Sequence, residues 1–338
     1  MKGDTKKGLK VFLGNFSLCR GNFANFIDIQ PHLNRWKIMT EPFKSGYASI
    51  VGRPNVGKST LLNRLVAQKV AVTSNRPQTT RNKITGVLHL PGAQIILVDT
   101  PGIHQSDRTL NEMMVRASLS TFSDVDLLLV MFSAESGFCP DDEFVLNSMR
   151  GVKTKKILVI NKIDLVDKSA LLSLIDEMNQ KSLFEEIIPI SALKEDGLDQ
   201  LKSLILNYLP EGPEYFPKEM VTDCPETFLF GEIIREKILK LTRFEVPHAV
   251  AVVVEDIYEQ DNGVVQIDAT IYAEKDSQKK ILIGEKGSML KNIGRQARQE
   301  IEKRLGVKLF LKLFVKVKAN WRDQKQSIKE FGYTHDSF

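Results

Sequence analysis

Residues 52–59 read Gly-Arg-Pro-Asn-Val-Gly-Lys-Ser and match the pattern G-x-x-x-x-G-K-S. An apolar segment at 47–51 precedes them, and an amphipathic segment with Leu61, Leu62 and Leu65 on one face follows. A strand, a glycine-rich loop and a helix in this order form the setting in which the pattern binds phosphate groups. The sequence therefore predicts a P-loop at residues 52–59.

The residue types of this loop suit phosphate binding. Gly52 and Gly57 allow the backbone to bend so that successive N–H groups face phosphate oxygens, and the N-terminus of the following helix adds positive potential. We expect Lys58 to reach the β- and γ-phosphates of a nucleotide and the Ser59 hydroxyl to coordinate Mg²⁺. The candidate nucleotide-binding residues here are Gly52, Arg53, Pro54, Asn55, Val56, Gly57, Lys58, Ser59 and Thr60.

A second apolar segment, 94–98, ends in Asp99-Thr100-Pro101-Gly102. A carboxylate at the end of a strand can hold Mg²⁺, commonly through water, and the Gly102 amide is placed to contact a γ-phosphate. The pattern Asp-x-x-Gly is a weak signal alone, but about forty residues after a P-loop it is strong. We therefore add Asp99, Thr100, Pro101 and Gly102 to the candidate site.

A third apolar segment, 157–160, ends in Asn161-Lys162-Ile163-Asp164. The Asp164 carboxylate can accept hydrogen bonds from N1–H and N2–H₂ of guanine, and adenine lacks this pair of donors. Asn161 can bridge the base and the P-loop, while the stem of Lys162 covers the face of the base. This motif predicts a preference for GTP over ATP.

The segment 187–190 leads to Ser191-Ala192-Leu193, whose backbone can meet the O6 atom of guanine. Each short motif thus follows a predicted strand, as ligand groups do in open α/β sheets. We expect an α/β P-loop GTPase domain, with an open, mostly parallel sheet and helices on both faces.

The ordered motifs resemble those of the translation-factor-class GTPases. Three segments are similar in sequence to motifs of the Era family. They are the P-loop, Gln78-Thr79-Thr80-Arg81 and the segment 99–104, which reads Asp-Thr-Pro-Gly-Ile-His. The resemblance implies that Gln78, Thr79 and Thr80 belong to the nucleotide site. It also implies that a threonine of this element binds Mg²⁺ and the γ-phosphate, and the sequence leaves Thr79 and Thr80 as alternatives.

Two positions bear on the chemistry. Ile103 occupies the place where Ras-like proteins have a glutamine that orients the attacking water, so we expect slow intrinsic turnover. The resemblance implies that Asn55 holds a potassium ion where an arginine finger would otherwise lie. The candidate catalytic residues are Lys58, Asn55 and Gly102, and the candidate Mg²⁺ ligands are Ser59, Thr79, Thr80 and Asp99.

The second half of the chain begins with a proline-rich, acidic stretch at 208–217, which is typical of a linker. A helical pattern follows at 227–241. Two β-rich segments, 249–255 and 264–273, are joined by Asp-Asn-Gly at 261–263, which predicts a hairpin.

Residues 284–287 read Gly-Glu-Lys-Gly and lie between two helical segments. A G-x-x-G loop flanked by basic residues suggests a KH domain, and the order in which a strand hairpin comes first resembles the type II arrangement. We therefore expect an α+β KH domain of type II. The candidate RNA-binding residues are Ile283, Gly284, Glu285, Lys286, Gly287, Lys291, Arg295 and Arg298.

Charge is unevenly distributed along the 338 residues, which carry 47 Lys+Arg and 42 Asp+Glu for a net charge of +5. Residues 1–38 hold seven bases and two acids and so account for the whole excess. Residues 275–329 hold 16 bases and 5 acids, a net charge of +11, whereas residues 216–274 hold 5 bases and 12 acids. The basic region around the G-x-x-G loop strengthens the case for RNA binding.

Composition excludes several other classes of protein. A hydrophobic content of 42% argues against disorder, and Cys19, Cys139 and Cys224 lack the spacing of a disulfide scaffold or a zinc site. Apolar stretches such as 127–132 are far too short to span a bilayer. The expected domains are an N-terminal extension at 1–43, the GTPase domain at 44–209, a linker at 210–223, the KH domain at 224–322 and a tail at 323–338.

Within this extension, residues 1–38 allow two interpretations: a disordered tail, or an upstream extension from a misplaced start codon with Met39 as the true start. We favour the second. The family resemblance covers residues 44 to about 335. It implies GTP and GDP as ligands with Mg²⁺ and K⁺, binding near the 3′ end of 16S rRNA and assistance to 30S subunit assembly. It also implies a cytoplasmic protein loosely associated with the inner face of the cell membrane. We expect a monomer.

Two other functions remain open at this stage. The chain could be a nucleotide-gated RNA chaperone for which hydrolysis is incidental. It could also be a membrane-signalling GTPase whose basic C-terminal region binds anionic lipid. The G-x-x-G loop distinguishes the second alternative, because lipid binding does not need it.

Overall fold

The computed structural model describes residues 42–74, 76, 79–103, 108–261 and 263–333. Residues 1–41 of the predicted extension, Gln78 and His104 lie outside the described residues. The prediction of an α/β domain with an open, mostly parallel sheet, followed by an α+β domain, is confirmed in the part of the chain that is described.

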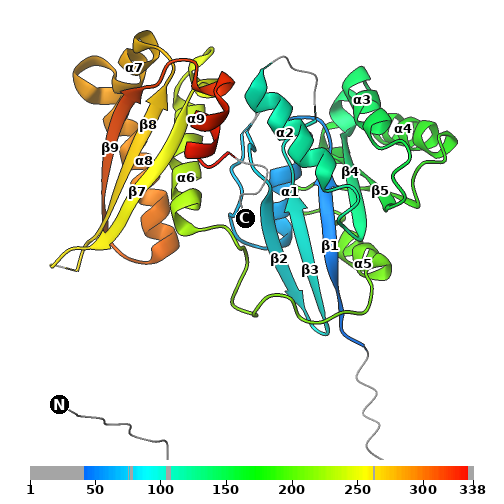
Figure 1. The fold of residues 1–338 in the computed structure, drawn as a ribbon. Helices are drawn as coiled ribbons and strands as arrows, with labels where there is room; N and C mark the ends of the chain where they lie inside the picture. The colour runs from blue at the N-terminus through cyan, green and yellow to red at the C-terminus, as the bar shows by residue number, and fades with distance from the viewer. Residues whose placement is uncertain (1–41, 75, 77–78, 104–107, 262, 334–338) are drawn as a thin grey trace, which may run out of the picture. The chain divides into compact units, whose positions relative to one another are not determined.

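A mixed six-stranded sheet forms the centre of the first domain within the described residues (Figure 1). The strand order is β2-β3-β1-β4-β5-β6, and every neighbouring pair is parallel except β2 and β3, which are antiparallel. The strands are β1 (Lys44–Val51), β2 (Ile84–Leu90), β3 (Ala93–Asp99), β4 (Leu127–Ser133), β5 (Lys155–Asn161) and β6 (Glu186–Pro189). Parallel strands place their carboxyl ends, and the motifs that follow them, at one edge of the sheet.

Helices cover both faces of this sheet, as expected. α1 (Lys58–Leu65) and α5 (Leu198–Tyr208) share one apolar core with the strands. α2 (Thr109–Ser120), α3 (Pro140–Ser148) and α4 (Lys168–Gln180) contribute to the core on the opposite face. Strand β4 is buried along its whole length, which explains its continuous apolar sequence.

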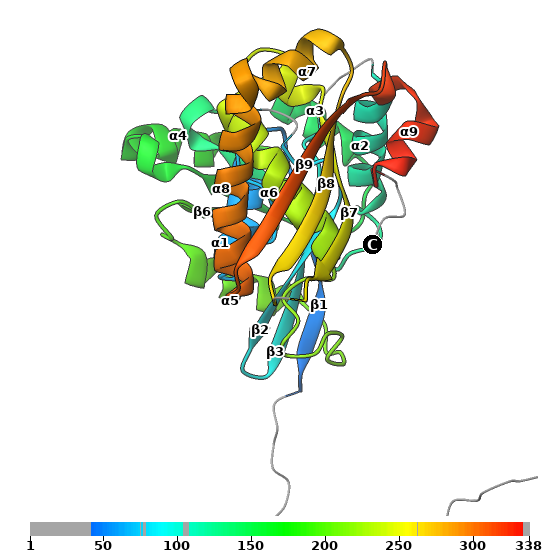
Figure 2. The same cartoon turned by 90° about the vertical axis from the view of Figure 1, so that its left-hand side faces the viewer.

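A smaller three-stranded sheet forms the second domain in the described residues, with strand order β7-β8-β9. The order of elements is α6 (Glu226–Leu241), β7 (Ala251–Glu259), β8 (Val265–Ala273), α7 (Asp276–Ile283), α8 (Ser288–Leu305) and β9 (Leu309–Val317). β7 and β8 are antiparallel, whereas β8 and β9 are parallel. Figure 2 shows β9 at the front with α8 beside it, and this α-β-β-α-α-β order is the type II KH arrangement.

One amphipathic face of the small sheet forms the KH core. Ile267, Ala269 and Ile271 of β8 point toward α6 and α8, where Ile234 and Ile293 are fully buried. The helical segment predicted after the G-x-x-G loop is confirmed as α8, whose Ile293, Ala297 and Ile301 pack in this core. A short helix, α9 (Lys325–Glu330), follows the sheet and belongs to a separate small cluster around Trp321.

The predicted linker is packed onto the GTPase sheet. The Gln94 side-chain carbonyl accepts hydrogen bonds from the amides of Tyr215 (2.9 Å) and Phe216 (3.1 Å). The amide of Val87 in the edge strand β2 donates to the carbonyl of Val221 at 2.9 Å. The acidic, proline-rich composition suggested a free connection, but a buried glutamine gives this segment fixed backbone partners.

Among the helices of the described residues, none is both long enough and apolar enough to cross a membrane.

Candidate functional site

The P-loop joins the end of β1 to the start of α1 in a conformation that needs its glycines. Gly57 has φ = 104°, in the left-handed region that favours glycine, and it precedes the first residue of α1. A β-carbon added to Gly52 would lie 2.5 Å from the carbonyl oxygen of Met131. The close approach of β4 therefore excludes a side chain at Gly52.

Lys58 is buried at the base of the loop. Its ammonium group donates to the carbonyl oxygens of Gly52 and Arg53, both at 3.0 Å. Burial lowers the pKa of Lys58 to about 8, with Asp99 opposing and Arg53 reinforcing the shift. The arrangement holds a cation at the point where the motif predicts the β- and γ-phosphates.

Three oxygen-bearing side chains, Ser59, Thr80 and Asp99, gather beside the P-loop, and we call them the oxygen cluster. The Ser59 hydroxyl donates to Asp99 Oδ2 at 2.6 Å, the Thr80 hydroxyl lies 3.2 Å from the same oxygen, and the two hydroxyls are 2.8 Å apart. Burial raises the pKa of Asp99, against the opposing effect of Lys58. The other carboxylate oxygen, Asp99 Oδ1, is buried without a hydrogen-bond partner in the described part of the chain.

The oxygen cluster fits a magnesium ion. Mg²⁺ binds hard oxygen ligands and usually combines a few protein oxygens with water and substrate phosphates. A buried carboxylate oxygen without a partner is costly unless a cation or donor satisfies it. Thr79 is oriented differently, because its hydroxyl donates to the carbonyl of Arg76 at 2.6 Å. The geometry therefore favours Thr80 over Thr79 as the metal ligand.

The opposite end of the site is built by the predicted guanine motifs. Asn161 donates from Nδ2 to the Val56 carbonyl at 2.8 Å, and its Oδ1 accepts from the Ala192 amide at 2.9 Å. The Ser191 hydroxyl donates to Asp164 Oδ1 at 2.7 Å. Asn161 thus ties the P-loop to the Ser191–Leu193 turn, which Ser191 in turn joins to Asp164.

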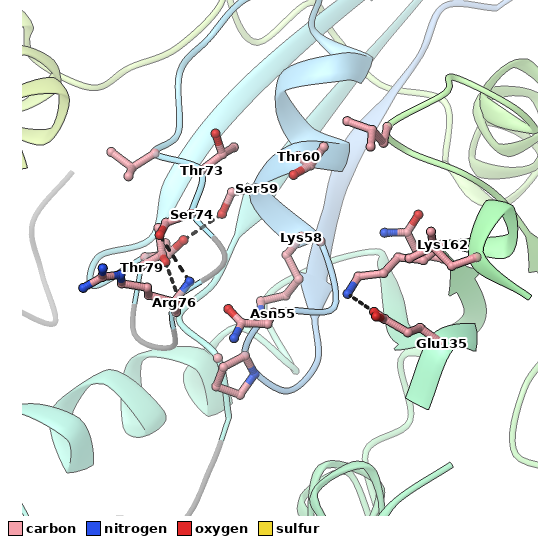
Figure 3. Close-up of a pocket in the computed structure, with 18 of the residues that line it drawn as sticks. Asn55, Lys58, Ser59, Thr60, Thr73, Ser74, Arg76, Thr79, Glu135 and Lys162 are labelled. Carbon is pink, nitrogen blue, oxygen red and sulfur yellow. Dashed lines mark hydrogen bonds and ion pairs between the residues drawn. The ribbon is translucent and has the colours of Figure 1, made fainter. Parts of the chain in front are cut away.

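A cavity of about 570 Å³ runs between these two ends. Figure 3 shows Arg76 and Thr79 on one side, Lys58 in the middle, and Lys162 with its ion-pair partner Glu135 on the other side. The predicted residues that line the cavity are Pro54, Asn55, Gly57, Lys58, Ser59, Thr60, Thr79, Thr80, Gly102, Asn161, Lys162, Asp164 and Leu193.

Other predicted residues support the cavity without lining it. Arg53 directs its guanidinium to Asp142 at 3.0 Å, so only its backbone is available to phosphates. The residues that do not line the cavity are Gly52, Arg53, Val56, Asp99, Thr100, Pro101, Ser191 and Ala192, and Gln78 lies outside the described residues.

Several residues that line the cavity lie outside the sequence motifs and were not predicted. They are Val72, Thr73, Ser74, Arg76, Glu135 and Leu165. Leu165 and Leu193 have exposed fractions of 56% and 62%, which is high for leucine side chains. Together with the stem of Lys162 they give the guanine end apolar surface suited to the face of a base. Ordinary residue types at non-motif positions carry no sequence signal of this role.

Ile103 is fully buried in the core beneath α2, and its amide donates to the Gly52 carbonyl at 3.2 Å. Its side chain therefore does not enter the cavity. A β-carbon on the neighbouring Gly102 would lie 2.8 Å from the backbone nitrogen of Pro54. This close contact brings the Gly102 backbone to the edge of the P-loop.

The G-x-x-G loop of the second domain lies between α7 and α8. Gly284 and Gly287 have φ of 73° and 78°, and Lys286 between them has φ = 50°. Lys286 is exposed, and so are Lys291, Arg295 and Arg298 on α8. The loop thus offers a bent backbone next to a helix N-terminus and a row of basic side chains, which suits binding to an RNA backbone.

Comparison with known proteins gives the same two domains. A family model described as a 50S ribosome-binding GTPase matches residues 47–162, and one described as a KH domain matches residues 245–322. GTPase Era of Geobacter metallireducens is 50% identical over 294 residues, which cover 87% of this chain and 99% of that protein.

The chain belongs to the Era family of GTPases. It is therefore a GTP-hydrolysing enzyme. GTPase Era of Geotalea daltonii is also similar, with 49% identity over 87% of this chain and its own full length.

Solved Era structures share the fold. A variant of Aquifex aeolicus Era bound to GDP and AlF₄⁻ is 43% identical and superimposes with a TM-score of 0.84 over 86% of this chain and 99% of its own. An Era structure solved with MgGDPNP and nucleotides 1506–1542 of 16S ribosomal RNA gives 43% identity and a TM-score of 0.85, with the same coverage.

Proposed function

We propose that this Era-family GTPase is a GTP-controlled RNA-binding switch that binds 16S rRNA near its 3′ end and assists assembly of the 30S subunit. The observation that carries the proposal is that one chain combines a cavity lined by the P-loop and the predicted guanine motifs with a G-x-x-G loop. The Era relative solved with 16S rRNA nucleotides, at 43% identity over 86% of this chain, supports the choice of RNA.

In the proposed mechanism, a bound GTP replaces internal contacts at the P-loop. Lys58 turns from the Gly52 and Arg53 carbonyls to the β- and γ-phosphates, and the backbone amides of the loop hold the remaining oxygens. Ser59, Thr80 and Asp99 would hold Mg²⁺, which neutralises charge on the phosphates when it is bound. The Gly102 amide contacts the γ-phosphate at the opposite edge.

Guanine specificity is assigned to Asp164, with Asn161 and the Ser191–Leu193 turn as its support. The Asp164→Asn variant replaces an acceptor of two donors by an amide, so it should lose the preference for GTP over other purine nucleotides. Competition binding against ATP and xanthosine triphosphate measures this. Unaltered guanine selectivity would contradict the assignment, and Asp167→Asn, at the start of α4, serves as the control.

Potassium activation is assigned to Asn55, which lines the cavity with φ = 65° and has an exposed side chain. Its side chain makes no hydrogen bond within the described residues, so its amide oxygen is available to coordinate a cation. Hydrolysis should be faster in K⁺ than in Na⁺ buffer. Equal rates in the two salts would show that Asn55 has no such role.

The proposed domains are the GTPase domain at 44–209, the connection at 210–223, the KH domain at 224–322 and the tail at 323–338. The proposed RNA contacts are the KH loop with Ile283 and the exposed bases Lys291, Arg295 and Arg298. A cytoplasmic monomer with loose membrane association stays a prediction.

Three experiments separate this function from its alternatives. Crosslinking and sequencing of RNA bound to the protein with a GTP analogue should recover the 3′ end of 16S rRNA, and Gly284→Asp should abolish that signal. If Asp99→Asn abolished hydrolysis but still rescued subunit assembly, hydrolysis would be incidental. Unchanged rRNA binding in Gly284→Asp with retained binding to anionic vesicles would favour the membrane-signalling alternative.

A further inference from the structure

Thr80 lies in a short stretch, residues 79–82, that we call the threonine segment. The segment supplies one hydroxyl of the oxygen cluster, but its backbone is held from outside the GTPase domain. Arg235 of α6 donates from Nη2 to the carbonyl oxygen of Thr79. Arg235 is fully buried and paired with Glu232, whose Oε1 and Oε2 accept from Nε (2.6 Å) and Nη2 (2.5 Å). The carboxylate fixes the plane of the guanidinium and aims it at Thr79.

The threonine segment makes a second contact with the KH domain through Arg81, the residue that follows Thr80. Arg81 is 4% exposed and donates from Nη1 to the Val250 carbonyl at 2.6 Å and from Nη2 to the His248 carbonyl at 2.9 Å. Its guanidinium lies 5.6 Å from the ring centre of Trp321 and 5.3 Å from that of Tyr333. The residues on both sides of Thr80 are therefore attached to the KH domain and the C-terminal segment.

We propose that Arg235 and Arg81 are positioning residues for GTP hydrolysis, which hold the Thr80 hydroxyl in the oxygen cluster from the RNA-binding half of the chain. The inference rests on the proposed metal role of Thr80. Thr80 lies in a coil, where the backbone has many accessible conformations unless its neighbours are fixed. The guanidinium groups of Arg235 and Arg81 restrain the residues on either side of it and so keep its hydroxyl in place. The KH domain thereby contributes to the geometry of the nucleotide site without touching the nucleotide.

The test uses the full-length protein with Arg235→Lys. A lysine keeps the positive charge beside Glu232, but it cannot hold both carboxylate oxygens and the Thr79 carbonyl in one plane. We expect the Mg²⁺ concentration for half-maximal hydrolysis to rise about tenfold, as for loss of a hydrogen bond from a charged group. The affinity for GDP, which has no γ-phosphate and needs no closed threonine segment, should change less than twofold. The Arg81→Lys variant should likewise raise the Mg²⁺ concentration for half-maximal hydrolysis and leave the affinity for GDP nearly unchanged.

Arg304→Lys is the matched control. Arg304, on α8, also reaches a backbone carbonyl of the GTPase domain, that of Lys69 at 2.7 Å, but Lys69 lies away from the threonine segment. This variant should hydrolyse GTP with the wild-type Mg²⁺ dependence.

The proposal would be overturned by either of two results. Wild-type Mg²⁺ dependence in both Arg235→Lys and Arg81→Lys would show that the contacts do not position Thr80. An equal loss of GDP affinity and hydrolysis would show a general structural defect. Failure of the proposed metal role itself is distinguishable, because then Thr80→Val would also leave the Mg²⁺ dependence unchanged.

Discussion

At the scale of single residues, Lys58 places a buried positive charge at the base of the P-loop. Within the described residues its buried ammonium donates to the carbonyls of Gly52 and Arg53, and burial lowers its pKa to about 8. A triphosphate brings opposite charge to the same place and stabilises the protonated form. Nucleotide binding should therefore raise the pKa of Lys58 and take up a proton near and above pH 8.

The resulting pH dependence has a definite sign. Below pH 8 Lys58 is already charged in the free protein and GTP affinity should be nearly constant, whereas above pH 8 each unit should weaken binding by up to about tenfold. Fluorescence titrations with GTP between pH 7 and 9 measure this. Guanosine, which lacks phosphates, is the control for ionisation of the base, and an equal loss of guanosine binding would remove Lys58 as the cause.

The two threonines give a second prediction at this scale. Thr80→Val removes a hydroxyl from the oxygen cluster, so hydrolysis should fall at least about tenfold and should need more Mg²⁺. Thr79→Val removes only a hydrogen bond to the Arg76 carbonyl and should cost much less. Steady-state hydrolysis at several Mg²⁺ concentrations distinguishes them, and a larger defect in Thr79→Val would reverse the assignment.

Most residues that line the phosphate and guanine ends of the cavity could be predicted from the sequence, because each motif there is a contiguous stretch of residues. It could not choose between Thr79 and Thr80, since that choice depends on side-chain orientation in a coil. Nor could it find the role of Arg235, whose acceptor, the Thr79 carbonyl, lies 156 residues away in the chain. Arg81 was quoted only as part of a family motif, and its contacts with Trp321 and Tyr333 have no local signal.

At the scale of elements, the two glycines of the KH loop are not equivalent. A β-carbon at Gly284 would lie 2.7 Å from the Met289 β-carbon and 2.8 Å from the Met289 amide nitrogen, whereas one at Gly287 would meet nothing within 4 Å. Both have positive φ, so both substitutions strain the backbone. Only Gly284 adds a clash with the start of α8.

Unequal costs in stability follow from this difference. Gly287→Ala should lower the free energy of unfolding of the KH domain by about 1 kcal/mol, the cost of a left-handed alanine. Gly284→Ala should lower it by at least about 2 kcal/mol because overpacking is added. Urea unfolding followed by circular dichroism compares the two variants, and equal midpoints would contradict the clash.

Among the elements, the helix predicted at 227–241 and the two strands predicted at 249–255 and 264–273 are confirmed as α6, β7 and β8. The packing of the connection at 210–223 was not predictable, because its composition is that of a free linker. The path of this connection depends on Gln94, a polar residue in an apolar strand. Its side-chain carbonyl accepts hydrogen bonds from the amides of Tyr215 and Phe216. Such a contact between distant segments is visible only in three dimensions.

For the whole molecule, the distribution of charge matters more than its sum. The net +5 equals the charge of residues 1–38, whereas the basic stretch 275–329 carries +11 next to an acidic neighbour. If RNA binds at the KH domain, the salt dependence of binding should come from α8 and the KH loop.

A salt titration tests this origin. Replacing Lys291, Arg295 and Arg298 together by Gln should lower the slope of log affinity against log salt by about 2, at about 0.7 per phosphate contact of a single strand. Deletion of residues 1–38 removes as much net charge as the whole chain carries, yet it should leave the slope unchanged. A slope that follows the deletion and not the triple variant would move the RNA site away from the KH domain.

The central claim is that the nucleotide state of the first domain controls RNA binding by the second. Its most direct test is the affinity of the full chain for an oligonucleotide of the 16S rRNA 3′ end, measured by fluorescence anisotropy with GDPNP and with GDP. We expect binding to be at least about tenfold tighter with GDPNP, which corresponds to a coupling free energy of about 1.4 kcal/mol. Equal affinity in the two nucleotide states would contradict it.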